Sequence, residues 1–348
     1  MFLKDFSFNL PEELIATKPA YPRDSSRLLF LESSNSYKET LFSNICDYLL
    51  PGDLLIVNNT KVNSSKIRGY KKNTKIEVEF TFIKNEKDGI WLCFALPGKK
   101  VNEGNFFIFR DIEGKIIKKN RENVYIDFGK KNNEFNELLS NFGQITLPPY
   151  ISKLRSFDEK DNEDYQTIYA RKSGSIAAPT AGLHFTDKLL AKIKSKDISI
   201  ESITLNIGPG TFLPLRNENI EENNLHSENF YISEETAELL NDAYKDNDRR
   251  IISVGTTSLR ALESSFDDNN YFKSLDTSTN IFIFPGKKIK SIDGLITNFH
   301  LPESSLFLLI CSLIGTKTAL EMYNYAIENK FRFYSYGDAC FLLNKNYG

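Results

Sequence analysis

The feature that most constrains the fold of this chain is a change in hydrophobic period along its length. Between about residues 58 and 149 the sequence alternates apolar and polar residues, as in TKIEVEFTFI, and IWLCFAL, NFFIFRDI and NVYIDFG follow. This period of two predicts strands in a small antiparallel sheet or barrel. From about residue 164 onward, short apolar strands such as SITLNI, RIISVG and GLIT are followed by polar turns, several of which lead into helical segments. That rhythm is typical of an α/β domain.

The two rhythms predict an α/β fold, with a mixed-sheet α/β main domain and an inserted antiparallel β-barrel domain. Residues 1–62 and 150–348 form the main domain on this interpretation, and residues 63–149 form the barrel. A length of 348 residues suits two domains with separate cores. Helix signals in the main domain include caps at Thr186 and Ser233, a short helix in LPEELIA that begins at Pro11, and two helices between residues 303 and 329, broken at Gly315.

The N-terminal segment and the cysteines predict a cytoplasmic protein. Lys4, Asp5 and Glu12 interrupt what would have to be the apolar core of a signal peptide. The longest apolar run, residues 306–315, is too short to span a bilayer, so no membrane partner is expected. The four cysteines stand far apart and match no zinc or redox spacing, which predicts reduced core thiols.

The charge of the chain is unevenly distributed. The net charge is −2, but residues 61–131 carry 17 Lys and Arg against 9 Asp and Glu. This region therefore has a net charge of +8, and the rest of the chain has −10. A solvated lysine-rich surface explains this pattern, and so does a surface that contacts the phosphates of a nucleic acid.

The three histidines are candidates for catalysis. His184, His226 and His300 each lie near an apparent strand end or helix start, where open α/β folds place ligands. Since no His-x-His, HExxH or nearby cysteine set accompanies them, acid–base chemistry is favoured over a metal site. Glu228, two residues beyond His226, would face the same side of a strand and could orient that imidazole. For each histidine taken alone, a structural hydrogen-bonding role stays open.

Three further segments could bind a ligand. In RIISVGTTSLRALESS the backbone and hydroxyl groups at Thr256 and Thr257, with Arg260 one turn later, could hold a carboxylate or phosphate at a helix start, although a simple capped helix explains them equally well. The GPGTF turn is similarly ambiguous. In FRFYSYGDACF, Asp338 could accept hydrogen bonds from ribose hydroxyls or from an amino group, or it could belong to a buried edge strand.

Ten sequence blocks, in order along nearly the whole chain, carry a family resemblance. They are DFSFNLPEELIATKPAYPRDSSRLL, GDLLIVNNTKV, LPPYI, EDYQTIYA, GSIAAPTAGLHFT, ITLNIGPGTFLPL, HSE, SVGTTSLRALES, DGLITNFHLPESSL and FRFYSYGDA. Together they resemble the S-adenosylmethionine:tRNA ribosyltransferase-isomerase family of queuosine biosynthesis. The family has a mixed α/β domain with a β-barrel insertion, in agreement with the division above.

The resemblance implies a specific reaction. The ribosyl part of S-adenosylmethionine is moved and isomerised onto 7-aminomethyl-7-deazaguanine at the wobble position of tRNA, giving epoxyqueuosine-tRNA, adenine and methionine. S-adenosylmethionine is then a consumed co-substrate, so no cofactor and no metal are expected. The partners are S-adenosylmethionine and a tRNA that carries the modified base in its anticodon loop, without an obligate protein partner.

The resemblance also implies site residues. His184, His226 and Glu228 are the predicted catalytic residues, because a base must remove a proton next to the sulfonium and a donor must assist the departure of adenine. The predicted substrate-binding residues are Asn59, Lys61, Thr180, Gly182, Gly210, Thr211, Gly255, Thr256, Thr257, Arg260, Asn298, His300, Tyr336 and Asp338.

The sequence departs from the family pattern at three positions. Asn206 and Asn223 stand where relatives often carry His, and Lys66 replaces an Arg. If these residues serve only as hydrogen-bonding groups, Asn can replace His. The alternatives are an S-adenosylmethionine-dependent RNA methyltransferase, which would usually carry a Gly-rich loop after its first strand, and a catalytically impaired tRNA-binding relative.

Overall fold

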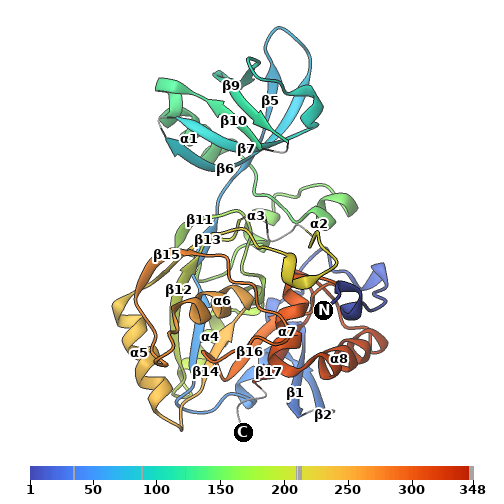
Figure 1. Cartoon of the computed structure of the whole chain (residues 1–348), viewed down its shortest axis with the longest axis vertical. Coiled ribbons are helices and arrows are strands. Elements are labelled where there is room, and N and C mark those ends of the chain that lie inside the picture. The colour runs from blue at the N-terminus through green and yellow to red at the C-terminus, as the bar shows by residue number, and fades with distance from the viewer. Residues whose placement is uncertain (34–35, 88, 122, 209, 211–213, 345–348) are drawn as a thin grey trace.

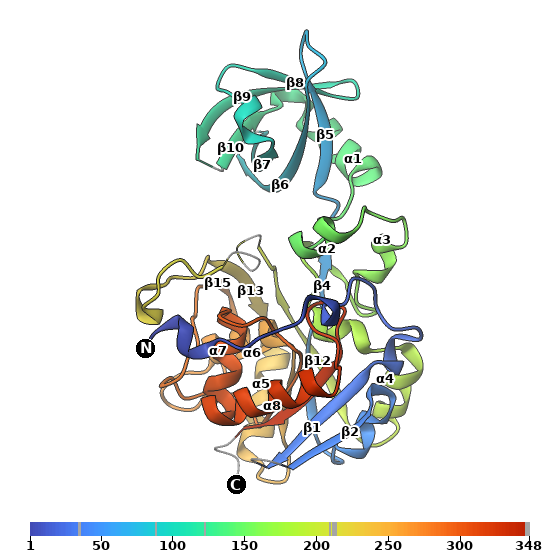
Figure 2. The same cartoon turned by 90° about the vertical axis from the view of Figure 1, so that its right-hand side faces the viewer.

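The protein consists of a sheet-based body and a barrel that stands apart from it on two connecting segments (Figures 1 and 2). The computed structural model describes residues 1–33, 36–87, 89–121, 123–208, 210 and 214–344. Among these residues, the body contains a nine-stranded mixed sheet and the barrel is closed by six strands. The predicted fold class is thus confirmed. The barrel strands run from Lys66 to Asp127, within the predicted range 63–149, and the domain boundaries themselves stay a prediction.

The central sheet extends through the whole body. Its strands lie in the order β15 (Leu275–Thr279), β13 (Glu228–Ile232), β12 (Ser199–Leu205), β3 (Leu54–Asn58), β14 (Ile251–Val254), β16 (Gly294–Asn298), β17 (Ala339–Leu343), β1 (Arg27–Ser33) and β2 (Ser36–Leu41). The neighbouring strands β12, β3, β14 and β16 are parallel, whereas β16 and β17 are antiparallel. Parallel strands are usually covered on both faces, which explains why β3 and β14 are buried throughout.

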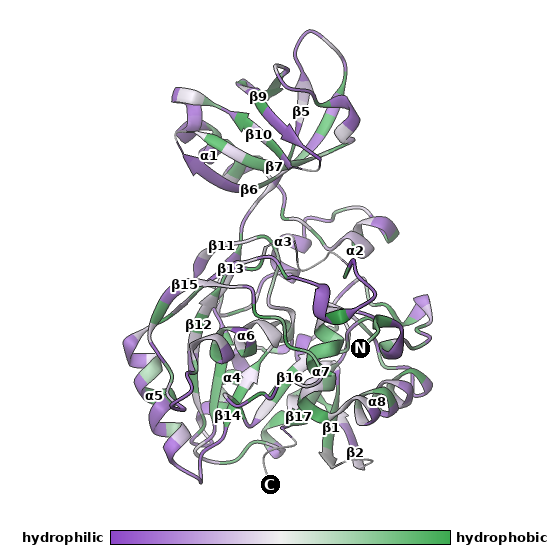
Figure 3. Ribbon diagram, viewed as in Figure 1, coloured by the Kyte–Doolittle hydropathy of each residue, from purple (hydrophilic) through white to green (hydrophobic). Residues whose placement is uncertain are grey.

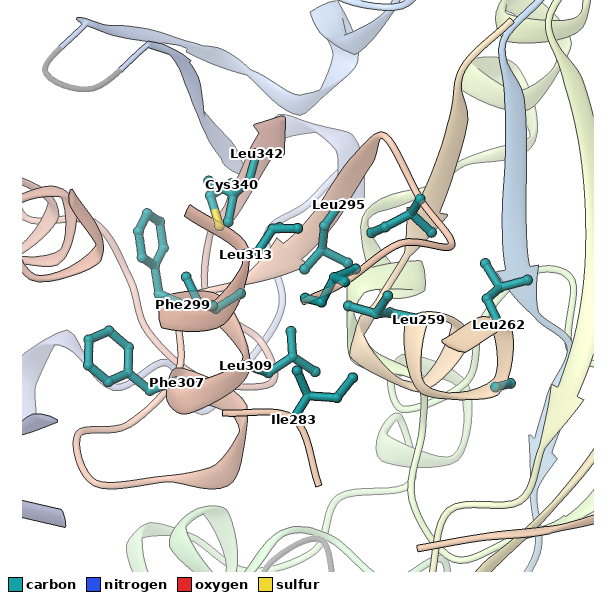
Figure 4. Close-up of a cluster of buried hydrophobic side chains, with 14 of the residues drawn as sticks. Leu259, Leu262, Ile283, Leu295, Phe299, Phe307, Leu309, Leu313, Cys340 and Leu342 are labelled. Carbon is teal, nitrogen blue, oxygen red and sulfur yellow. The ribbon is translucent and has the colours of Figure 1, made fainter. Parts of the chain in front are cut away.

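Helices cover both faces of this sheet. They are α4 (Asp187–Lys194), α5 (Glu234–Lys245), α6 (Thr256–Ser265), α7 (Ser305–Ile314) and α8 (Thr316–Glu328). Leu54 and Ile56 of β3 pack into the core shared with α5 to α8, while Leu55 and Val57 pack into the core shared with α4, as the alternation of a strand requires. Figure 4 shows part of the first core, and Figure 3 shows that apolar residues concentrate on the sheet and on the inner faces of the helices.

Aromatic side chains fill the barrel. Its strands lie in the order β10 (Asn123–Asp127), β7 (Ile90–Leu96), β6 (Glu77–Lys87), β5 (Lys66–Lys71), β8 (Phe106–Phe109) and β9 (Ile112–Asn120). Phe135 of α1 (Asn132–Phe142) stacks on Phe128, with ring centroids 3.7 Å apart, so the helix packs onto the barrel core. A Cβ atom on Gly69 would lie 2.7 Å from the Phe109 ring, and only glycine leaves room for that phenyl ring.

The connecting segments carry the remaining elements. These are β4 (Thr60–Val62), which pairs with β11 (Lys172–Ser175), and the short helices α2 (Pro149–Leu154) and α3 (Asp161–Asp164). Three short 3₁₀ helices matter below: η2 (Glu12–Leu14), η4 (Phe42–Asp47) and η7 (Thr180–His184).

Most of the predicted helix signals are confirmed. The Thr186 and Ser233 side chains accept backbone hydrogen bonds at the starts of α4 and α5. Gly315 separates α7 from α8 with a φ of 90°, a conformation that glycine adopts without strain. The short helix predicted from Pro11 forms only the 3₁₀ turn η2, because Ile15 leaves the helix to form a bridge with Phe333.

The described residues contain no single helix that is long and apolar enough to cross a membrane. The helices α7 and α8 meet the length and composition criteria only as a pair, and that pair is bent by 116°.

A buried ion pair should make a large contribution to the stability of the body. Asp53 accepts hydrogen bonds of 2.9 and 2.6 Å from the Arg250 guanidinium, and both side chains are less than a tenth exposed. We expect Asp53→Ala to lower the free energy of unfolding by about 3–5 kcal/mol, because it leaves a buried cation without its partner. Urea unfolding followed by far-UV circular dichroism measures the change. The exposed pair variant Lys317→Ala should change stability by about 0.5 kcal/mol or less, and equal effects of the two variants would contradict the argument.

Candidate functional site

The main cavity of the body lies at the carboxyl ends of β14 and β16. It has a volume of about 320 Å³ and is bounded by η7, the first residues of α6, the end of β16 and the start of α7. Open α/β sheets place ligands at this edge. Six predicted substrate-binding residues are among those that line it: Thr180, Gly255, Thr256, Thr257, Asn298 and His300.

A buried amide fixes the edge of the sheet at this cavity. Asn58, the last residue of β3, donates to the Leu205 carbonyl over 2.9 Å and to Thr257 Oγ1 over 3.2 Å, and its Oδ1 accepts from the Leu205 and Thr60 amides. It therefore joins β3, β12 and the first turn of α6. Asn58 is not among the residues predicted from the sequence, although a polar residue at the end of an apolar strand is a usable signal.

A second missed residue is Tyr165. This tyrosine lines the main cavity and is fully buried, yet its hydroxyl makes no hydrogen bond to the described residues. Burial raises the pKa of this phenol, and the Ala178 backbone and the Ser335 side chain, which also line the cavity, only partly offset that rise. Buried hydroxyls are normally hydrogen-bonded, so Tyr165 is available to a polar group of a ligand.

His184 lies behind the cavity wall. Its Nδ1 is 2.8 Å from Ser26 Oγ, its Nε2 is 3.2 Å from Asn298 Nδ2, and its ring stacks on Phe42. Burial, together with the positive charges of Arg332 and Arg23, lowers the pKa of His184 to about 3. The imidazole is thus neutral near pH 7, and it holds the Asn298 amide that lines the cavity.

His300 is also neutral. It lines the main cavity, its Nε2 is 3.1 Å from Thr297 Oγ1, and its backbone amide donates to the Tyr323 hydroxyl. Burial alone lowers the pKa of His300 to about 3. At neutral pH this imidazole can exchange hydrogen bonds with a ligand but is a weak base.

A second, smaller cavity of about 30 Å³ adjoins the first, and Ser305 and Leu306 line both. Its polar wall contains His226, Glu228 and Arg260. Arg260 Nη1 donates to Glu228 Oε2 over 2.5 Å, Arg260 Nε donates to the Ile281 carbonyl, and Glu228 Oε1 accepts from the Gly208 amide. Arg260 Nη2 is buried and makes no hydrogen bond to the described residues, so one donor of the guanidinium stays open to a ligand.

His226 is exposed and lines two cavities. It borders the second cavity, and it also borders a large groove of about 980 Å³ between the body and the barrel. We call this the barrel groove, and it is lined by Phe94, Lys119, Asn120, Arg121, Asn123, Arg216 and His226. A Cβ atom on Gly210 would lie 2.3 Å from the His226 ring, so glycine permits this close packing. The main cavity, the second cavity and the barrel groove therefore form a series in which adjacent members share residues.

Several predicted site residues have protein partners away from these cavities. The Asn59 amide bonds to Ser202 and Thr204, and the Asp338 carboxylate accepts from the Arg27 and Arg332 amides and pairs with the Arg332 guanidinium. Lys61 is exposed on β4, and Gly182 packs against the Tyr169 hydroxyl.

Two further predicted positions differ in what can be described. The Tyr336 hydroxyl is buried and makes no hydrogen bond to the described residues. Thr211 lies outside the described residues. For all of the predicted site residues, catalytic or binding roles stay predictions.

The two asparagines at the departures from the family pattern have structural partners. Asn223 Oδ1 accepts from the Arg216 and Asn217 amides, and its Nδ2 donates to the Asn217 and Asn219 carbonyls. Asn206 Oδ1 accepts from the Thr60 hydroxyl over 2.8 Å. Both amides serve as hydrogen-bonding groups.

Within the described part of the chain, no group of His, Cys, Asp and Glu side chains is arranged to hold a metal ion.

The fold and its connected cavities define an α/β protein with a basic barrel beside a ligand-sized pocket. The chain belongs to the family described as queuosine biosynthesis protein, whose model matches residues 3–342. It is 42% identical over 350 residues to the S-adenosylmethionine:tRNA ribosyltransferase-isomerase of Halothermothrix orenii, covering 99% of this chain and all of that protein. The protein of the same name from Clostridium kluyveri is 41% identical over 345 residues, covering 98% and 100% of the two chains.

A solved structure supports the same relationship. The crystal structure of the S-adenosylmethionine tRNA ribosyltransferase of Thermotoga maritima is similar to this chain, with a TM-score of 0.56 and 28% sequence identity. The match covers 97% of this chain and all of the Thermotoga maritima chain.

The neutral histidines should make stability depend on pH. In the folded chain the pKa of His300 is about 3, whereas the ordinary value is 6.5, so below pH 6.5 the unfolded chain binds the proton more strongly. Stability is therefore lost as the pH falls toward 3. Between pH 5.5 and 4, we expect His300→Gln to reduce the slope of unfolding free energy against pH by about 1.4 kcal/mol per pH unit, as measured by urea unfolding. If His300→Gln showed the same slope as the wild type, the lowered pKa of His300 would be contradicted.

Proposed function

We propose that this chain is an S-adenosylmethionine:tRNA ribosyltransferase-isomerase. In this reaction the ribosyl moiety of S-adenosylmethionine is transferred and isomerised onto 7-aminomethyl-7-deazaguanine at the wobble position of a tRNA, with release of adenine and methionine. The observation that carries the proposal is the relation over the full length to relatives of that name at 41–42% identity. S-adenosylmethionine is a consumed co-substrate, so the chemistry has to come from the residues of the chain and from the sulfonium itself.

The main cavity suits a nucleoside, and the small second cavity suits a carboxylate group. The main cavity has the size of a small-molecule pocket and offers the Tyr165 hydroxyl, Asn298 and His300 as polar groups for a nucleoside. The adjoining cavity offers the open Nη2 donor of Arg260, which suits a carboxylate. Glu228 holds the guanidinium in place through its ion pair, so in this proposal Glu228 is a positioning residue for Arg260.

His226 is the strongest candidate for the catalytic base. The sulfonium acidifies the neighbouring ribose methylene group, and a base must accept that proton. With pKa values of about 3, His184 and His300 are weak bases. His226 is exposed and borders both the second cavity and the barrel groove, so it lies between the two proposed substrates. In this proposal His184 positions Asn298 and His226 moves the proton.

The tRNA side of the proposal rests on charge. The net charge of +8 in residues 61–131 favours contact with phosphates, and the reacting base would have to leave its stack to reach the S-adenosylmethionine site beside His226. We propose the barrel, residues 63–149, as the tRNA-contacting domain.

The competing functions have less support. A methyltransferase would act on the methyl group of the same sulfonium, but the relatives that match this chain over its full length are named ribosyltransferases. A catalytically impaired relative was suggested by Asn206 and Asn223. Both amides have the hydrogen-bonding roles described above, so these departures give no reason to expect lost activity.

The products distinguish these functions. With S-adenosylmethionine and tRNA that carries 7-aminomethyl-7-deazaguanine, we expect equal amounts of adenine and methionine, quantified by liquid chromatography. S-adenosylhomocysteine as the product would instead indicate methyl transfer. Binding of the tRNA without turnover would indicate an impaired relative, and either result would contradict the proposed reaction.

Replacing the proposed base should reduce catalysis with little effect on binding. We expect His226→Ala to lower kcat for adenine release by about a hundredfold or more, because positioned general acids and bases usually contribute at least that factor. The exposed neighbour variant Asn224→Ala should stay within about twofold of the wild type and controls for disturbance of the loop. If His226→Ala turned over within a few-fold of the wild type, His226 would not be the base.

A further inference from the structure

The barrel groove has a defined position on the barrel. The strand pairing can be followed around the barrel. Lys66 of β5 pairs with Thr81 of β6, and Thr81 pairs with Phe94 of β7. Cys93 of β7 pairs with Val124 of β10, and the next residue, Asn123, pairs with Asn120 of β9. These pairs follow one another around a single end of the barrel. Lys66 is also near the point where the chain enters the barrel from the body, so this end faces the body (Figures 1 and 2). Arg121, just after β9, thus lies toward the loop that carries Arg216 and His226.

The arginines of the barrel groove differ in their ion pairing from several other cations of the barrel. Lys66, Arg68 and Lys72 form ion pairs with Glu79, Glu77 and Glu113, respectively. Within the part of the chain that the structure describes, Arg121 and Arg216 form no ion pair, and no carboxylate is among the lining residues of the groove. Among the described residues, therefore, no carboxylate neutralises the positive charge of these two arginines.

Lys119 has a different role in the same groove. Its Nζ donates to the Gly98 and Val101 carbonyls over 2.8 and 2.7 Å, so the ammonium group fastens a barrel loop. We therefore assign ligand contacts to Arg121 and Arg216 and a structural role to Lys119.

The remaining lining residues suit a nucleic acid better than an acidic protein. Phe94 is partly exposed, and its strand neighbours Cys93 and Ala95 lie in or against the barrel core, so its ring faces outward into the groove. Asn120 and Asn123 flank the Arg121 turn and supply amide groups. Outward aromatic rings beside unpaired arginines are the usual elements of single-stranded RNA binding, in which bases stack and phosphates pair with cations.

The loop of the body that carries Arg216 is fastened in place. Asn223 hydrogen-bonds to the backbone of residues 216, 217 and 219, and only a side-chain amide combines this acceptor with two donors. The backbone at Arg216 is thus held in place, and Arg216 lines the groove from the body whereas Arg121 lines it from the barrel. The two arginines can contact one ligand from both sides.

We propose that the barrel groove binds the backbone of a single-stranded RNA loop, with Arg121 and Arg216 each contacting a phosphate and Phe94 contacting a base. This inference rests on the proposed function and specifies how its RNA substrate is held. A loop seated in the groove lies beside His226, so one base turned out of the loop can approach the proposed catalytic base.

The test uses two charge-matched double variants of the full chain. Arg121→Gln/Arg216→Gln removes the proposed contacts. Lys317→Gln/Lys330→Gln removes the same charge from exposed positions of the body, in the first turn of α8 and just beyond its end, outside the basic region 61–131. Fluorescence anisotropy with an anticodon stem-loop RNA gives the Kd and its salt dependence. Far-UV circular dichroism confirms that both variants are folded.

We expect the arginine variant to raise Kd by about tenfold or more and to reduce the slope of log K against log salt concentration by about 1.4, since each phosphate contact to a single strand contributes about 0.7. In turnover, KM for the RNA should rise while kcat at saturating RNA stays within about twofold. The lysine variant should change Kd by about threefold or less.

Equal losses in the two variants, or an unchanged Kd and slope in the arginine variant, would overturn the groove assignment. If the wild type releases adenine and the arginine variant binds RNA normally, the assignment of RNA binding to the barrel groove is wrong and the proposed function stands. If RNA binding depends on the two arginines but the wild type releases no adenine, the assignment of RNA binding to the barrel groove is supported and the proposed reaction is contradicted.

Discussion

The architecture of the site depends on the hydrogen bonds of one buried amide, that of Asn58. This side chain ends the central strand β3, and it bonds to both backbone groups of Leu205 in β12 and to Thr257 in α6. A buried amide is costly unless its donors and acceptors are paired, so these bonds allow essentially one arrangement of the two strand ends and the helix start. The main cavity is built on that arrangement. The chain then continues through β4 into the barrel, which links the site to the basic domain.

The connected cavities divide the chemistry by environment. Burial keeps His184 and His300 neutral, which suits them to hydrogen bonding. The Arg260–Glu228 pair provides a fixed cation at the next cavity, and His226 is exposed at the entrance to the barrel groove. In our proposal the three environments follow one another in the same order as the parts of the substrates that they bind: nucleoside, carboxylate and RNA.

Much of the fold could be predicted from local sequence, whereas the detail of the site could not. Alternation identified the barrel strands, and the Thr186, Ser233 and Gly315 signals depend on residues close in sequence. The contacts of Asn58 with Leu205 and Thr257 join residues that are 147 and 199 positions apart, so no local pattern predicts them. The same holds for the Arg260–Glu228 pair. From sequence, Arg260 was a partner for a ligand and Glu228 a partner for His226, and only the fold brings the two together.

The central claim is that the ribosyl part of S-adenosylmethionine, and not its methyl group, is transferred to RNA. The most direct test supplies S-adenosylmethionine labelled with carbon-13 in all ribose carbons of the adenosyl group, or separately in the methyl group, and determines the mass of the modified nucleoside after digestion of the RNA. Our account predicts that the nucleoside gains every labelled ribose carbon and no methyl label. Methyl label in the RNA, or no ribose label, would contradict it.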